Sequence, residues 1–121
     1  MRGMTNSCLR WMFQKFNRKY FHSCLPKRFA VRFSDLERNA FGVTRFRTIY
    51  VKNKGRKGYK RNTAIGPIEI DNRFKRSRPI VAMTLLHEMV HAAYPDISGH
   101  GPRFQRKMLQ LAKAGAFNAW W

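Results

Sequence analysis

The chain has 121 residues, of which 44% are hydrophobic, and it carries 25 Lys and Arg against 6 Asp and Glu. This size predicts one domain, residues 1–121, and the ten Phe residues spread along the chain exclude global disorder. No apolar run approaches the length of a membrane span, and the first residues lack a signal-peptide core. A formal net charge of +19 favours nucleic acid as the partner over an anionic membrane. We therefore expect a soluble, intracellular monomer.

Residues 8–22 are predicted to form an amphipathic helix. Apolar residues recur there at spacings of three and four, namely Leu9, Met12, Phe13, Phe16 and Tyr20. Pro26 lies beyond the helix end, and we interpret His22 as an ordinary helix-end histidine. Cys8 and Cys24 are too far apart for a C-x-x-C motif. We expect two free, partly buried thiols, with a single disulfide as the alternative.

Three strands are predicted next. A short strand over residues 30–33 is followed by a turn or one helical turn at 34–37. Residues 41–51 are rich in aromatic and β-branched side chains, which favour a second strand. Residues 64–70 predict the third strand, in which Pro67 indicates an edge position or a break because proline donates no backbone hydrogen bond.

The segment between the last two strands, residues 52–61, is strongly basic. It reads K-N-K-G-R-K-G-Y-K-R, and Gly55 and Gly58 favour a turn, so the simplest expectation is a hairpin with a basic tip. Sequence-independent contacts to phosphates of single- or double-stranded DNA are predicted for Lys52, Lys54, Arg56, Lys57, Lys60 and Arg61. Candidates for stacking on unpaired bases are Tyr59, Trp120 and Trp121. Core packing or a disordered tail suits the two tryptophans equally well.

Two further helices complete the chain. Residues 79–93 predict a helix with Ser77 as its N-cap and Pro95 as its stop. A third helix is expected from Pro102 to about Gly115, with a buried stripe of Phe104, Met108 and Leu111. The order helix, strands, helix, helix predicts an α+β domain with a small antiparallel or mixed sheet.

The second helix contains the sequence H-E-M-V-H. Residues four apart share one face of a helix, so His87 and His91 can hold one metal ion, for which Zn²⁺ is expected. In hydrolases with H-E-x-x-H, the glutamate, here Glu88, is the catalytic base and not a ligand. A catalytic zinc takes three protein ligands, and after His91 only Asp96 and His100 are suitable donors. We favour His100 because its flanking glycines allow a sharp turn back to the helix, and Asp96 is the weaker alternative.

Several segments resemble the SprT-like (Spartan) zinc metalloprotease family. The most specific signature is H-E-M-V-H-A at residues 87–92 followed by G-H-G-P-x-F at 99–104, and similar upstream segments are residues 16–26, 31–36 and 68–74. The resemblance implies a zincin-like fold and a peptidase that degrades proteins bound or crosslinked to DNA. It also implies Glu88 as the catalytic base and three zinc ligands, His87, His91 and His100. The chain lacks the C-x-x-C pairs of the zinc ribbon that many relatives carry, so we expect a minimal version, which would suit a virus or mobile element.

Two other functions stay open at this point. A three-histidine zinc on a basic protein also suits a nuclease or another phosphodiesterase, and the zinc of a non-enzymatic DNA-binding protein would be purely structural. Glu88 argues for peptide substrates and against a structural zinc. Tyr94 and Arg103 are candidates, by position only, for stabilising an oxyanion.

Overall fold

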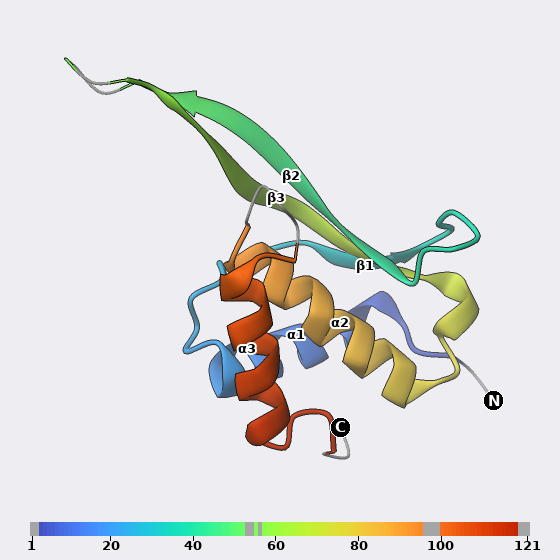
Figure 1. The fold of residues 1–121 in the computed structure, drawn as a ribbon. Coiled ribbons are helices and arrows are strands. Elements are labelled where there is room, and N and C mark those ends of the chain that lie inside the picture. Colours follow the sequence, from blue (N-terminus) through green and yellow to red (C-terminus); the bar gives the residue numbers. More distant parts are fainter. Residues whose placement is uncertain (1–2, 53–54, 56, 96–99, 119–121) are drawn as a thin grey trace.

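The computed structural model describes residues 3–52, 55, 57–95 and 100–118 (Figure 1). In chain order the elements are α1 (Asn6–Tyr20), β1 (Val31–Ser34), β2 (Gly42–Val51), β3 (Tyr59–Asp71), the 3-10 helix η1 (Asn72–Phe74), α2 (Arg78–Ala93) and α3 (Pro102–Lys113). This confirms the predicted α+β class with a small mixed sheet and the predicted order of elements. The third strand is longer than predicted, because it begins at Tyr59 and not at residue 64.

The sheet has the strand order β1-β3-β2, with β1 parallel and β2 antiparallel to β3. Because β3 is the central strand, the predicted edge position of Pro67 is wrong. The alternative prediction, a break in the strand at Pro67, agrees with the pattern of strand pairing. The pairing of β3 with β2 shifts register between Thr44 and Phe46, and its pairing with β1 begins only at Ile68. Proline is tolerated at this irregularity because no regular ladder bond requires its missing N–H group.

Beyond this irregularity, β2 and β3 continue alone as a two-stranded hairpin. The regular pairs run from Phe46–Ala64 to Val51–Tyr59. In Figure 1 this hairpin projects well away from the helices, and the basic turn is at its far end. The antiparallel pairing therefore confirms that β2 and β3 form the predicted hairpin.

The helices lie on one side of the sheet (Figure 1) and bury a single core with it. All five apolar residues of the predicted α1 stripe are buried. Helix α2 packs against β2, β3, α1 and α3, and it is therefore apolar on nearly every side. Its buried hydrophobic residues are Val81, Ala82, Leu85, Leu86, Met89, Val90 and Ala92. Thr84 and Glu88, the buried polar residues of α2, therefore lie within the core, whereas Arg78 in the first turn is exposed.

Several local predictions need correction or refinement. Ser77 precedes α2 as predicted but makes no side-chain capping hydrogen bond. In the α3 stripe, Met108 is only partly buried, whereas the other two residues are buried. Cys8 and Cys24 are free thiols, but both are exposed, so their predicted partial burial is wrong. Cys8 is exposed in the first turn of α1. None of the described helices is long and apolar enough to cross a membrane.

Candidate metal and catalytic site

Three histidine side chains meet beside the central helix. His87 and His91 lie one turn apart on α2, and His100 lies just before α3. One ring nitrogen from each lies within 4.8 Å of the other two, and the Nε2 atoms of His87 and His91 are 3.2 Å apart. Two nitrogens bound to one tetrahedral Zn²⁺ at about 2.05 Å would be about 3.4 Å apart. The three residues therefore suit a metal ion, while Asp96, the alternative ligand, lies outside the described residues.

Phe104 of α3 packs against all three histidine rings. Its ring centroid lies 4.4 Å from that of His91, 4.7 Å from that of His100 and 5.1 Å from that of His87. The sequence predicted Phe104 only as a core residue, but here it also forms the apolar support that orients the histidines. Burial lowers the pKa of His87, and the nearby His100 lowers it further. A lowered pKa favours the neutral imidazole, which is the form that binds metals.

Glu88 lies next to the histidines, with only 7% of the residue exposed. One carboxylate oxygen, Oε2, is 4.0 Å from Nε2 of His87. The other, Oε1, accepts a 2.8 Å hydrogen bond from the hydroxyl of Thr44 on β2. Burial raises the pKa of Glu88, and the hydrogen bond from Thr44 opposes that rise. A buried carboxylate with one oxygen fixed and the other facing a metal ligand has the geometry of a general base.

Sequence reasoning missed Thr44. It is buried on a strand 44 residues before Glu88, and no local motif marks that pairing. Gly42, close by, lets β2 approach α2, because a Cβ atom there would lie 2.7 Å from Cγ2 of Thr84 and 3.2 Å from Cγ of Glu88. The close contact between β2 and α2 thus depends on the absence of a side chain at residue 42.

A groove of about 390 Å³ leads along this contact to the candidate site. Its lining combines residues before and at the start of β2 with one face of α2, namely Asn39, Ala40, Phe41, Gly42, Met83, Thr84, His87 and Glu88. Phe41 and Met83 are 54% and 48% exposed, which is high for large apolar side chains. The groove therefore offers an apolar surface directly beside the carboxylate and one histidine.

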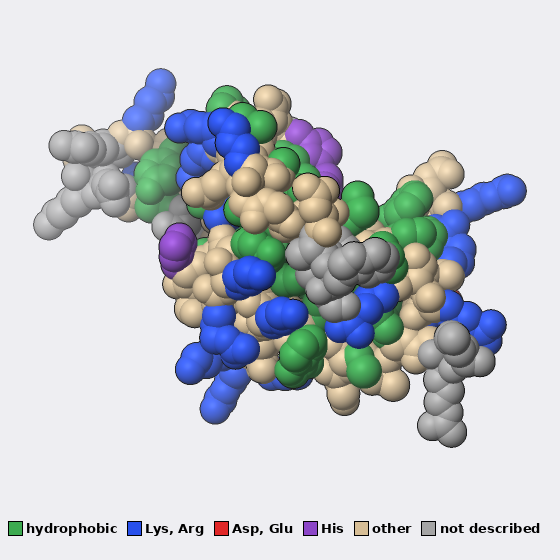
Figure 2. Space-filling view, turned by 90° about the horizontal axis from the view of Figure 1, so that it is seen from below, with side chains coloured by type: hydrophobic (Ala, Val, Ile, Leu, Met, Phe, Trp, Pro, Cys, Tyr) green, Lys and Arg blue, Asp and Glu red, His purple; other side chains and the backbone are tan. Residues whose placement is uncertain are grey.

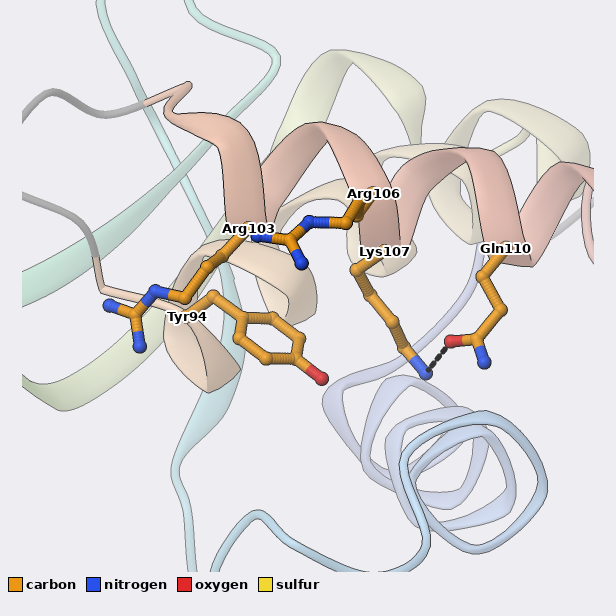
Figure 3. Close-up of a pocket in the computed structure, with 5 residues that line it drawn as sticks. All are labelled: Tyr94, Arg103, Arg106, Lys107 and Gln110. Atoms are coloured by element: carbon orange, nitrogen blue, oxygen red, sulfur yellow. Dashed lines mark hydrogen bonds between the residues drawn. The ribbon is translucent and has the colours of Figure 1, made fainter.

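Of the predicted DNA-binding residues, the described ones lie at and near the end of the hairpin, which projects away from the helices (Figure 1). Lys52, Lys57 and Lys60 are exposed there, as is the stacking candidate Tyr59. Outside the described part of the chain lie Lys54, Arg56, the side chain of Arg61, Trp120 and Trp121. The oxyanion candidates Tyr94 and Arg103 do not line the groove beside Glu88 but a second pocket on α3 (Figure 3).

The acidic side chains are concentrated inside the domain. Glu69, Asp71 and Glu88, three of the six acidic residues, are buried. Glu69 pairs with Arg45 at 2.9 Å and with Arg32 at 3.1 Å. The hydroxyl of Ser34 and these two guanidinium groups lower the pKa of Glu69 against the effect of burial. The surface is consequently dominated by one sign of charge. The helical face in Figure 2 displays Lys and Arg, and no Asp or Glu among the residues coloured there.

The fold and the three histidines define a small α+β protein with a candidate metal centre of the metalloprotease type. The model of the SprT-like family matches residues 9–119, and the chain belongs to that family. The match covers most of α1, the sheet, α2, α3 and all three histidines, so it confirms the resemblance found in the sequence. Searches of curated proteins and of solved structures found no match.

Proposed function

We propose that the protein is a zinc-dependent metallopeptidase with a zincin-like fold, which acts on proteins bound or crosslinked to DNA. The observation that carries the proposal is the convergence of His87, His91 and His100 beside the buried carboxylate of Glu88. A structural zinc has no use for an oriented carboxylate next to its ligands, whereas peptide hydrolysis requires a base at that place. Membership of the SprT-like family supports the same reaction class.

In this mechanism the three histidines hold Zn²⁺. The bound ion would polarise the scissile carbonyl and lower the pKa of a water molecule toward about 7. Glu88 accepts the proton of the attacking water and then delivers it to the leaving amine. We assign both transfers to Oε2, because it faces His87 while Oε1 accepts the hydrogen bond from Thr44. Phe104 would support the three imidazole rings through its apolar contacts with them.

The groove beside Glu88 supports a peptide as the substrate. The exposed side chains of Phe41 and Met83 provide apolar contacts for a substrate residue next to the scissile bond. The strand order makes β2 an edge strand of the described sheet, and its start borders the groove. An extended peptide can therefore add to β2 by backbone hydrogen bonds while a side chain enters the groove.

The basic surface supports recruitment to DNA. Contacts from the hairpin tip to phosphates provide affinity without sequence preference. Log affinity for duplex DNA is then expected to fall with log salt at a slope of about −0.9 for each phosphate contacted. Among the described residues, Lys52, Lys57 and Lys60 are exposed for this purpose.

One assay tests the proposal and the nuclease alternative together. The zinc-loaded protein is incubated with a protein crosslinked to a labelled oligonucleotide, with the same protein free, and with the oligonucleotide alone. We expect cleavage of the crosslinked protein and an intact oligonucleotide. Glu88→Gln should retain zinc and lose all turnover, whereas Glu37→Gln, the same change at an exposed loop position, should behave as wild type. Undiminished proteolysis by Glu88→Gln would refute the catalytic assignment, and cleavage of the oligonucleotide that requires Glu88 would favour the nuclease.

A further inference from the structure

A second pocket, of about 470 Å³, lies on a flank of α3 (Figure 3). Four of its lining residues share one stripe of α3, and the fifth comes from the end of α2; they are Arg103, Arg106, Lys107, Gln110 and Tyr94. Three of the five are cationic and none is acidic. The described lining residues therefore give the pocket a positive charge and include no carboxylate.

Lys107 is buried at the floor of this pocket. Only 7% of the residue is exposed, and its ammonium group donates hydrogen bonds to the backbone oxygen of Tyr20 and to Oε1 of Gln110. The ammonium also lies 4.9 Å from the ring centroid of Phe21. No carboxylate pairs with Lys107 within the described ranges. The carbonyl end of α1 stabilises this cation in part, but a buried charge without an anionic partner is costly to retain.

Arg106 adds a second cation to the pocket. It is exposed and forms no hydrogen bond or ion pair with the residues that the structure describes. In Figure 3 the side chain of Arg106 extends toward the part of the pocket where Tyr94 lies, and the hydroxyl of Tyr94 points toward the side where Lys107 lies. A guanidinium group binds phosphate oxygens in a bidentate manner, and an aromatic ring can stack on a nucleobase.

We propose that this pocket binds one nucleotide unit of a DNA strand, with its phosphate on Arg106 and Lys107 and its base or sugar against Tyr94. This inference rests on the DNA-binding part of the proposed function. The volume exceeds what a single phosphate needs and falls in the range of small-molecule sites. An acidic peptide could pair with the cations, but its carboxylates would offer no flat ring to stack on Tyr94. Since Tyr94 lies three residues after His91, a strand in this pocket passes close to the candidate metal centre.

The test compares two variants that remove the same charge from α3. Arg106→Gln changes the pocket, and Lys113→Gln changes an exposed position at the end of the helix outside it. Binding of a labelled single-stranded oligonucleotide, and of an acidic peptide of equal charge, is followed by fluorescence anisotropy across a range of salt concentrations. A parallel experiment photocrosslinks an iodouracil oligonucleotide to the wild-type protein and maps the modified residue by mass spectrometry.

We expect Arg106→Gln to reduce the salt slope by about 0.7 and, at about 0.1 M salt, to weaken oligonucleotide binding about fivefold, because one phosphate contact is lost. Lys113→Gln should stay close to wild type, and the crosslink should map to Tyr94. Equal losses in both variants, or a loss for the peptide alone, would overturn the pocket assignment. A wild-type protein that binds no oligonucleotide would overturn the DNA-binding part of the proposed function, whereas tight binding by both wild type and Arg106→Gln would overturn only the pocket.

Discussion

Thr44 offers the sharpest test of how the carboxylate of Glu88 is held. The Thr44 hydroxyl has one proton, and its contact to Oε1 of Glu88, at 2.8 Å, is shorter than its contact to the Glu88 backbone oxygen, at 3.2 Å. Thr44→Val keeps the shape of the side chain and removes this bond. A hydrogen bond to a charged group contributes about 1.5–3 kcal/mol. If the bond acts fully in the transition state, kcat should fall roughly 10- to 100-fold with KM little changed.

The assay is steady-state cleavage of a quenched fluorescent peptide, with zinc content and thermal unfolding measured on the same samples. Thr44→Ser, which keeps the hydroxyl, should recover most of the lost kcat. Thr48→Val makes the same change at an exposed position on β2 and should have little effect. A Thr44→Val enzyme with normal kcat would show that the bond does not position the base. Loss of zinc or of folded protein in that variant would indicate a structural role instead.

Three further predictions concern the metal, the acid limit of stability and the hairpin. His100→Ala should weaken zinc binding by more than about 100-fold, as measured by competition with a chelator, whereas His22→Ala, at an exposed histidine outside the cluster, should not. The pKa of Glu69 is lowered in the folded state, chiefly by the hydroxyl of Ser34, so its stabilising contribution is complete above the unfolded pKa of about 4.3. That contribution should disappear as pH falls through the folded pKa, and Glu69→Gln should flatten this part of the unfolding curve; an unchanged curve would contradict the assignment. Lys57→Gln with Lys60→Gln should reduce the salt slope for duplex DNA by up to about 1.8, and an unaltered slope would exclude the tip from binding.

The parts of the site that lie on one helix could be predicted from the sequence. His87, Glu88 and His91 occupy fixed offsets on α2, so helical geometry alone places them together. His100 required a second argument, from the chemistry of the donors that remain after Pro95. The predictions for α2 depend on the spacing of residues along one helix, which can be read directly from the sequence.

The rest of the site depends on contacts between distant elements. Thr44 reaches Glu88 only because β2 pairs with β3 in one register, and a shift by one residue would turn its hydroxyl to the other face. The edge position, one of the two alternatives for Pro67, is wrong because the proline rule assumes a regular ladder, which the register shift interrupts. The pocket on α3 was likewise not predicted, because its wall includes Tyr94 and its buried Lys107 reaches back to the end of α1.

The length of the projecting hairpin determines how far the basic tip lies from Glu88. Seven residue steps separate Thr44, which contacts Glu88, from Val51 at the end of β2. At about 3.3 Å per residue, this stretch of β2 spans about 23 Å, which corresponds to roughly seven nucleotides along one DNA strand, and the basic tip lies beyond it. If the tip binds phosphates as proposed, the carboxylate would act on chain segments about one hairpin length from the bound DNA. The selection of substrates would then depend on where a protein stands relative to the DNA and not on its amino-acid sequence.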